Sequence, residues 1–307
     1  MLFEEVYIQY TDYIEYRKKP QTRKFLKDNF EKKILPYFEG RNIYDITELD
    51  YAKWQDEIEK FNYKNSYKSN LHYIFSGFFN YCVLFHKLDH NIARRVGNFK
   101  MTNVKVEKDF YTLWEFIKFI RKMDHNIIKP FFIILYHYCT RPGEAMAFRF
   151  SDLSNDRKLT VNFSISEHCI NGERIIDTPK SLDSVRSWKL SRRDYKMLMK
   201  LKQYYINKYG MKDYNYFIFG GIKPLSPTTI NRYKIKACEK AKIRPLELRG
   251  FRRSGASLMY HLNVPLAIIK EWLGHADERT TSKYYIMPYE SKRKRVTRTL
   301  NLTRLLF

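Results

Sequence analysis

The first hundred residues carry a hydrophobic pattern that recurs at three- and four-residue steps. Phe3, Val6, Tyr7, Tyr10 and Tyr13 follow this spacing, which predicts an amphipathic helix at the start of the chain. Further helices are predicted from Thr22 to about Leu35, over Leu49–Phe61 with Thr47 or Asp50 as the cap, and over Asn65–His86. No strand pattern competes, so we expect residues 1–99 to form a small helical domain.

The pattern changes between residues 100 and 108, which lack a helical period and carry little apolar mass. We interpret this stretch as a linker to a second domain over residues 109–307. There, helices are predicted to begin near Thr112 and to span Ile127–Tyr138.

Strands are predicted only in the middle of this second domain. Residues 158–165 alternate between apolar and polar, and Asn171-Gly172 is a tight-turn signal. Together with Ile175-Ile176 and Val185–Leu190 they suggest a three-stranded antiparallel sheet, after which helices resume past Ser191. The expected fold class is mainly α with a small antiparallel β-sheet: a helical domain followed by a mixed α/β domain.

Charge is concentrated in the second domain. The chain has 57 Lys and Arg against 33 Asp and Glu, a net charge of +24. Residues 1–100 contribute 17 basic and 14 acidic side chains, and the remainder contributes 40 and 19. Such an excess favours a polyanionic partner, either nucleic acid or an acidic membrane surface.

The membrane alternative finds no support in the apolar pattern. No run of about 18 uncharged apolar residues is present, and the acidic N-terminus lacks a signal-peptide pattern. The four cysteines, Cys82, Cys139, Cys169 and Cys238, are widely spaced and are typical of reduced core residues. We therefore expect a cytoplasmic protein.

Two segments carry candidate phosphate-binding cations. In CTRPGEAMAFRFSDL, Arg141 precedes a Pro-Gly step at a predicted helix start, where backbone N–H groups favour an anion, and Glu144 is placed to orient the guanidinium. In TPKSLDSVRSWKLS, Lys180 lies in a turn between strands, with Arg186 on the second strand. Taken alone, the first segment is more typical of a capped helix, and the second of a solvated hairpin lysine.

A third segment, LRGFRRSGASLMYHLNVPLAIIKEWLGHADERTTSKYYIM, is richer in candidate chemistry. Arg252 is predicted to open a helix. A second helix is predicted to end at Leu273-Gly274, because glycine after the last apolar position stops a helix. His275 follows this glycine, and the pair Tyr284-Tyr285 lies nine and ten residues further on.

In this order, the segments resemble the tyrosine recombinase family, which includes integrases of phages and other mobile genetic elements. The resemblance is carried by Arg-x-Gly-Glu, the hairpin lysine, Gly-Phe-Arg-x-Ser, Leu-Gly-His and Thr-Thr-x-x-Tyr-Tyr. It covers residues 110–290 well. Residues 1–98 resemble the family's core-binding domain more loosely, best over Ile34–Thr47.

The resemblance implies a site-specific recombinase that cuts and rejoins DNA without a metal or other cofactor. Arg141 and Arg252 would hold the non-bridging phosphate oxygens, and His275 would donate or orient another hydrogen bond. Lys180 would protonate the departing 5′ oxygen as general acid. A tyrosine would attack the phosphorus and stay linked to the 3′ phosphate.

Two questions about the implied site stay open: the role of Arg249 and the identity of the nucleophile. The family usually has a histidine where this chain has Arg249, and arginine can supply charge there but cannot transfer a proton near neutral pH. Either that proton step is dispensable or activity is reduced. The nucleophile lies nine residues after His275, at Tyr284, or ten, at Tyr285; integrases with the Gly-Phe-Arg-x-Ser motif favour the longer step and hence Tyr285.

The implied partners are double-stranded DNA, further copies of the chain in a dimer-to-tetramer synapse, and an accessory directionality factor. Self-association is expected to use the apolar C-terminal residues Leu300, Leu302, Leu305 and Leu306, unless this tail folds back on its own domain. A bacterial or phage-encoded, nucleoid-associated protein is expected. Two other functions stay open: a DNA-relaxing enzyme similar to type IB topoisomerases, and an inactive relative that only binds DNA.

Overall fold

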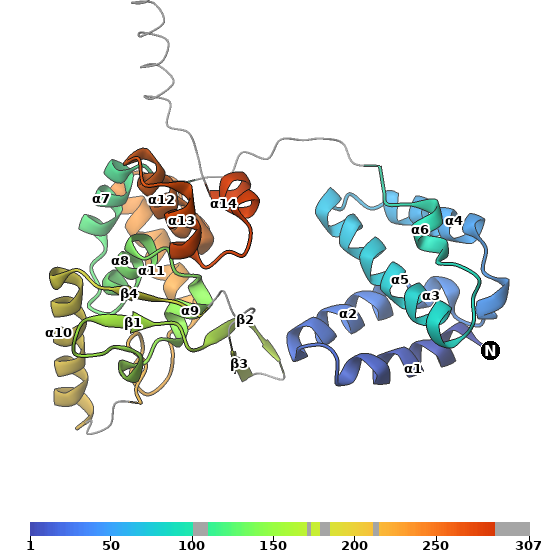
Figure 1. Cartoon of the computed structure of the whole chain (residues 1–307), viewed down its shortest axis with the longest axis horizontal. Helices are drawn as coiled ribbons and strands as arrows, with labels where there is room; N and C mark the ends of the chain where they lie inside the picture. Colours follow the sequence, from blue (N-terminus) through green and yellow to red (C-terminus); the bar gives the residue numbers. More distant parts are fainter. Residues whose placement is uncertain (101–109, 171–172, 179–184, 211–214, 286–307) are drawn as a thin grey trace, which may run out of the picture. The chain divides into compact units, whose positions relative to one another are not determined.

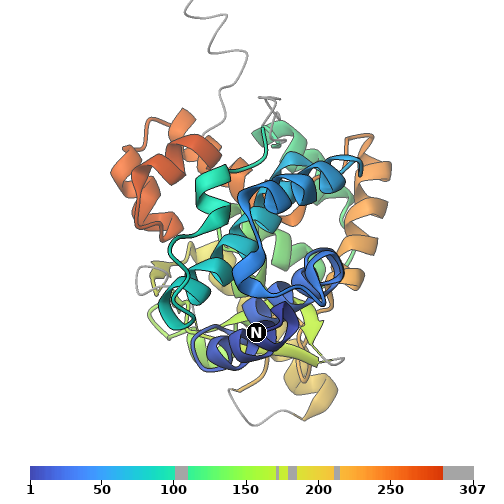
Figure 2. The ribbon, with the colours of Figure 1, turned by 90° about the vertical axis from the view of Figure 1, so that its right-hand side faces the viewer.

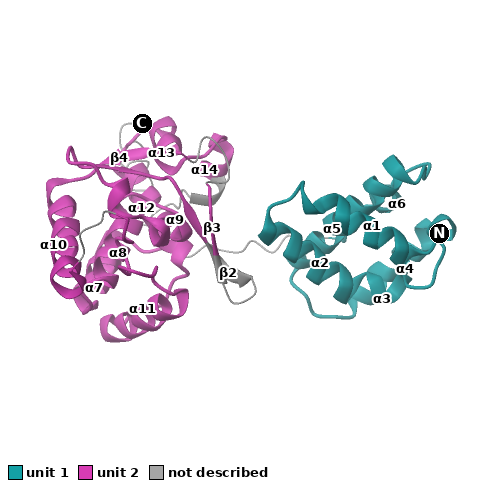
Figure 3. Cartoon of the chain, turned by 90° about the horizontal axis from the view of Figure 1, so that it is seen from below, with its two compact units in different colours: residues 1–106 teal, residues 107–307 magenta. Residues whose placement is uncertain are grey.

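The computed structural model divides the chain into two compact units, Met1–Val106 and Glu107–Phe307 (Figure 3). It describes residues 1–100, 110–170, 173–178, 185–210 and 215–285, without the side chains of 166–174 and 283–285. The expected linker, residues 100–108, lies almost entirely outside the described residues. Each unit has its own hydrophobic core.

All regular elements in the described part of unit 1, residues 1–100, are helices. Its elements are α1 (Phe3–Glu15), α2 (Pro20–Lys33), α3 (Leu35–Phe38), a 3-10 turn (Ile43–Asp45), α4 (Glu48–Glu59), α5 (Asn65–Phe85) and α6 (Ile92–Val96). Figures 1 and 2 show these helices, blue to teal, gathered around α5. The four helices predicted for this part of the chain are present as α1, α2, α4 and α5.

The core of unit 1 is built from aromatic rings that meet on α5. Phe75, which is fully buried, lies 5.1 Å from the ring of Phe38, 5.0 Å from Trp54 and 4.7 Å from Phe79 between centroids. The first two pairs are edge-on and the third is stacked, and such pairs add to the free energy gained by burying apolar surface. These contacts join α3 and α4 to α5.

Three details of unit 1 differ from the prediction or refine it. The second helix ends before Pro36, and a separate short helix, α3, follows. Pro36 lies in the first turn of α3, where a backbone N–H would have no acceptor within the helix, so the N–H that proline lacks is not missed. The predicted caps of α4 act together: the Thr47 hydroxyl accepts from the Asp50 N–H, and the Asp50 carboxylate accepts from the Thr47 N–H at 2.9 Å. Helix α6, with Asn91 as its cap, was missed because it has only five residues.

The other helices that the structure describes lie in unit 2, together with a 3-10 turn (Phe150–Asp152). They are α7 (Leu113–Lys122), α8 (Ile128–His137), α9 (Pro142–Ala147), α10 (Arg192–Tyr209), α11 (Pro227–Ala241), α12 (Leu248–His261), α13 (Leu266–Leu273) and α14 (Glu278–Tyr285). Helix α8 passes through the core and packs against α12 (Figure 1). Helix α12 begins at Leu248, so Arg252 lies in its second turn and does not open it.

The strands of unit 2 correct one prediction. They are β1 (Lys158–Thr160), β2 (Ser164–Ile170), β3 (Glu173–Asp177) and β4 (Ser187–Lys189). Within the described residues they form two separate antiparallel pairs, β1 with β4 and β2 with β3, so the three-stranded sheet is wrong. The predicted single strand 158–165 breaks near Asn162, whose amide donates to the Asp152 carboxylate at 2.6 Å. The fold class, mainly α with small antiparallel sheets, is confirmed.

Helices α8 and α12 approach closely at Gly255. A Cβ atom at this position would lie 2.0 Å from the Tyr136 carbonyl oxygen and 2.7 Å from Cys139 Sγ. Only glycine therefore allows this separation of the two helices. Because Arg252 lies one turn earlier on α12, the same close contact sets the distance from Arg252 to the end of α8. No helix in the described parts of the chain is long and apolar enough to cross a membrane.

Candidate active site

Arg141 is the N-cap residue of α9. Its backbone N–H donates to Glu144 Oε2 at 2.7 Å, and its Nη1 donates to Glu144 Oε1 at 2.7 Å. Its Nη2 donates to the carbonyl oxygen of Gly274 at 3.1 Å. The side chain keeps 35% of its surface exposed, so this guanidinium is oriented by the protein and still reaches solvent.

Glu144 is the buried centre of the cluster. Besides Arg141, it accepts two hydrogen bonds from Arg186, at 2.8 and 3.1 Å. Burial by itself raises the pKa of Glu144, but the positive charges of Arg186, Arg252 and Arg141 outweigh it and lower the pKa to about 2. The carboxylate is therefore ionised at neutral pH and orients two guanidinium groups at once.

Arg186 was predicted to lie on a strand and was given no role; in the structure it lies directly before β4. The side chain is only 8% exposed, and its Nε donates to the Trp272 carbonyl oxygen at 3.0 Å. One signal was available: Arg186 and Trp188 are two residues apart, so they share one face of a strand, and Trp188 is apolar enough to face the core. Trp188 is indeed buried, and its Nε1 donates to the same Trp272 oxygen.

Arg252 on α12 is 1% exposed. Its Nη1 donates to the Cys139 carbonyl oxygen at 2.7 Å, and its Nη2 donates to that of Leu273 at 2.8 Å. Its Nη2 also lies 2.8 Å from His275 Nε2. The guanidinium is thereby fixed between the end of α8 and the end of α13.

His275 follows the C-cap of α13. Gly274 adopts the left-handed conformation at φ 64°, which ends the helix and turns the next side chain inward. Burial, together with the positive charges of Arg252, Arg141 and Arg186, lowers the pKa of His275 to about 3. The imidazole is therefore neutral at pH 7. Its Nδ1 lies 2.9 Å from the hydroxyl of Thr281, a fully buried residue on α14.

Arg141 and Arg252 converge on one turn although they are far apart in the sequence. Arg141 bonds Gly274, and Arg252 bonds its neighbours Leu273 and His275. Among the described residues of this cluster, three guanidinium groups surround a single carboxylate. The cluster therefore has more positive than negative charge in a largely buried place, which favours the binding of an anion.

The other predicted site residues are less closely defined. Arg249 lies one turn before Arg252 on α12 and is exposed. Lys180, between β3 and β4, lies outside the described residues. Tyr284 and Tyr285 form the last turn of α14, which packs against α12 and α13, but their side chains also lie outside the described part.

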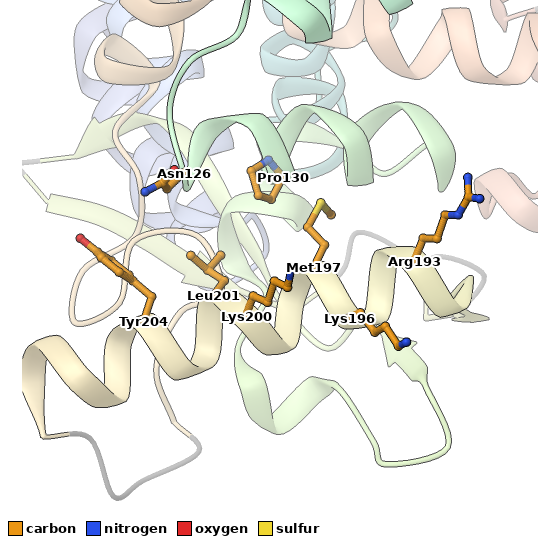
Figure 4. Close-up of a pocket in the computed structure, with 8 residues that line it drawn as sticks. All are labelled: Asn126, Pro130, Arg193, Lys196, Met197, Lys200, Leu201 and Tyr204. Carbon is orange, nitrogen blue, oxygen red and sulfur yellow. The ribbon is translucent and has the colours of Figure 1, made fainter.

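A groove of about 540 Å³ on unit 2 shares no residue with this cluster (Figure 4). It lies along α10 beside the start of α8. Its lining combines an apolar floor with cations: Asn126, Pro130, Arg193, Lys196, Met197, Lys200, Leu201 and Tyr204. None of the catalytic residues predicted from the sequence lines this groove, so the arginine cluster stays the candidate active site.

Replacing Glu144 by Gln is expected to lower the free energy of unfolding by about 3 kcal/mol, the equivalent of its pKa shift from 4.5 to about 2. Glu115→Gln is the matched control, because Glu115 pairs with Arg244 at 2.7 Å where both side chains are partly exposed. That variant should cost less than about 1 kcal/mol. Urea unfolding at pH 7 gives both values, and equal losses would show that the Glu144 carboxylate is not specially stabilised.

Known proteins resemble this chain in sequence over both units. A model of the phage integrase family matches residues 113–291, and one of the phage integrase N-terminal SAM-like domain matches residues 2–58. ICEBs1 integrase of Bacillus subtilis (strain 168) is 26% identical over 283 residues, covering 89% of this chain and 75% of the relative.

Solved structures share the fold. An integrase of the Tn1549 transposon, in complex with transposon right-end DNA, matches with a TM-score of 0.72 at 16% identity, covering 97% of this chain and 99% of the other. A lambda integrase dimer bound to a core site matches with a TM-score of 0.66 at 17% identity, covering 93% and 77%. Because the family model spans more than half of its residues, the chain belongs to the phage integrase family and is a tyrosine site-specific recombinase.

Proposed function

We propose that this recombinase integrates or excises a mobile element by cutting and rejoining duplex DNA through a covalent 3′-phosphotyrosine. The observation that carries the proposal is the convergence of Arg141 and Arg252 on the turn around Gly274. Two guanidinium groups at one turn, in a cluster with surplus positive charge, match a phosphodiester whose negative charge grows during attack.

The arginines would act on the phosphate directly. Each guanidinium can offer two parallel N–H groups to two oxygens. Glu144 orients Arg141, and backbone carbonyl oxygens orient Arg252, so little reorganisation is needed when charge develops. Arg249, exposed one turn before Arg252, would add positive charge at the edge of the site without transferring a proton.

Covalent chemistry would fall to Tyr285, with Tyr284 as the alternative. The phenolic oxygen forms a bond to phosphorus, the bond from phosphorus to the 5′ oxygen breaks, and the phenolic proton passes to water. Lys180 gives a proton to the departing 5′ oxygen. Rejoining is the reverse: a 5′ hydroxyl attacks the phosphotyrosine, and the energy of the broken bond is conserved.

Both units are proposed to contact the DNA. Unit 1 is proposed as the core-type DNA-binding domain over residues 1–99, joined by residues 100–108 to a catalytic domain over 109–307. Because residues 101–307 carry most of the net positive charge, affinity should fall steeply with salt.

Assembly and location are proposed from the relatives. The Tn1549 and lambda structures contain DNA, and lambda integrase is seen as a dimer and as a tetramer on a Holliday junction. We propose a similar dimer-to-tetramer assembly for this chain, an accessory directionality factor, and a cytoplasmic, nucleoid-associated location. The C-terminal residues proposed to join protomers lie outside the described residues: Leu300, Leu302, Leu305 and Leu306.

The experiment is a junction assay on the DNA that flanks the gene. The chain is expressed beside its own flanking sequence, and the joined ends are amplified and sequenced. Excision predicts a circular junction that appears with the wild type and is lost in the Tyr284→Phe/Tyr285→Phe double variant. Relaxation of supercoiled DNA without a junction would favour the topoisomerase-like alternative, and DNA binding with neither product would favour the inactive relative.

A further inference from the structure

The imidazole of His275 is held by a hydrogen bond at each nitrogen. Nε2 lies 2.8 Å from Arg252 Nη2, and Nδ1 lies 2.9 Å from Thr281 Oγ1. Arginine has no acceptor, so its N–H donates and Nε2 accepts. A neutral imidazole carries its single N–H on the other nitrogen. The proton therefore resides on Nδ1 and is donated to the hydroxyl of Thr281.

This tautomer cannot yet serve the proposed reaction. To stabilise a phosphate, Nε2 must donate a hydrogen bond, but in the structure it has no hydrogen to give. A second proton on the ring would supply one. However, burial and the charges of Arg252, Arg141 and Arg186 oppose a charged ring more strongly than the carboxylate of Glu144 favours it. Moving the single proton from Nδ1 to Nε2 avoids that cost, because the ring stays neutral.

A hydroxyl is the partner that permits such a move, because it can either accept or donate. We propose that Thr281 is a positioning residue whose hydroxyl accepts from His275 Nδ1 in the free enzyme and donates to it when a DNA phosphate is bound. One proton leaves Nδ1 for water, and one from water arrives at Nε2. Because a protonated Nε2 can no longer accept from Arg252, the imidazole and the guanidinium move apart, and Arg252 Nη2 and His275 Nε2 both donate to the phosphate, with no change in net charge.

The position of Thr281 links this switch to the nucleophile. Thr281 is fully buried on α14, the helix that ends with Tyr284 and Tyr285 and packs against α12 and α13. Its hydroxyl connects that helix to His275, and His275 connects it to Arg252 on α12. His275 Nε2 can therefore become a hydrogen-bond donor to the phosphate only while α14, which carries the candidate nucleophiles, is packed against α12 and α13. This inference rests on the proposed function and adds a condition for it.

Two substitutions separate the hydroxyl from the shape of the side chain. Thr281→Val keeps the volume and removes the hydroxyl, whereas Thr281→Ser keeps the hydroxyl and removes a methyl group. With a nicked suicide duplex containing the recovered junction, the single-turnover cleavage rate should fall about 10- to 100-fold in the valine variant, less than the loss of a whole oxyanion donor. The serine variant should stay within about threefold of wild type, and DNA affinity should be unchanged in both.

A second measurement does not depend on the stability of the valine variant. Nitrogen-15 NMR of the imidazole side chains reports which ring nitrogen carries hydrogen, and His275→Gln identifies the His275 signals. The free protein should show the Nδ1–H tautomer. The DNA complex of the Tyr284→Phe/Tyr285→Phe variant, which stays noncovalent, should show Nε2–H.

Four results would overturn the proposal: Nε2–H in the free protein, a doubly protonated ring in the complex, a valine variant as fast as wild type, or a serine variant as slow as the valine variant. A wild type that forms no covalent adduct would instead defeat the proposed function. The tautomer of the free protein could still be determined in that case, so the two failures are distinguishable.

Discussion

Tyr285→Phe is expected to abolish the covalent protein–DNA adduct on a suicide duplex while leaving the fold and DNA affinity intact. The change removes one oxygen atom, which is the atom proposed to bond to phosphorus, and no other group can replace a missing nucleophile at the same place. The loss should be complete within detection. Adduct is measured as protein that migrates with labelled DNA after denaturation.

Tyr284→Phe is the matched control, because it makes the same chemical change one residue earlier on α14. It should retain adduct formation within about threefold of wild type. The reverse pattern would transfer the nucleophile to Tyr284 and leave the mechanism unchanged. Adducts from both single variants and from the double variant would show that neither tyrosine is the nucleophile.

Arg141→Ala is expected to slow cleavage about 10²- to 10³-fold, as the loss of a preorganised charged donor does elsewhere. DNA affinity should change only a few-fold, because many other cations contribute to binding. Arg141 is a better test than Arg252: it is 35% exposed and its removal spares the core, whereas Arg252 is 1% exposed and bonds two buried carbonyl oxygens.

Arg193→Ala on α10 is the control, since it removes one cation from the same unit in the separate groove. It should leave the cleavage rate near that of wild type. If Arg141→Ala lost affinity by the same factor as cleavage, Arg141 would be a docking residue and not part of the phosphate clamp.

Helices were the most predictable part of this chain, because each carries its own periodicity and end signals. Thr47 with Asp50 marks the start of α4, and Gly274 marks the end of α13. Both signals depend only on neighbouring residues. Helices α3 and α6 are exceptions, since four and five residues give too short a pattern to detect.

The strands were predicted less well, because pairing partners are set by distant residues. The alternation over residues 158–165 indicated extended chain, but it carries no information about which strand lies alongside. In the structure β1 pairs with β4, and β2 pairs with β3. Asn162 lies between β1 and β2. The hydrogen bond from its side chain to Asp152 could not be predicted from the sequence.

The candidate site was predictable only as far as motifs reach. Arg141, Glu144, Arg252 and His275 were named from the sequence, and the structure brings them to one turn. The burial and contacts of individual side chains, which no motif shows, identified two further residues of the site. Arg186 resembled an ordinary strand cation until its side chain proved buried against Glu144, and of the threonine pair on α14 the contact with His275 singled out Thr281.

The most direct test of the central claim is to identify the residue that holds the DNA. Wild-type protein is incubated with a suicide duplex in the presence of a chelator, the adduct is digested with trypsin and nuclease, and the remaining nucleotide-bearing peptide is sequenced by mass spectrometry. The account predicts a 3′-phosphate linked to the phenolic oxygen of Tyr285, or of its neighbour Tyr284, with a yield that the chelator leaves unchanged. A linkage to any other residue, a 5′-phosphate linkage, or an adduct that forms only when divalent ions are present would contradict it.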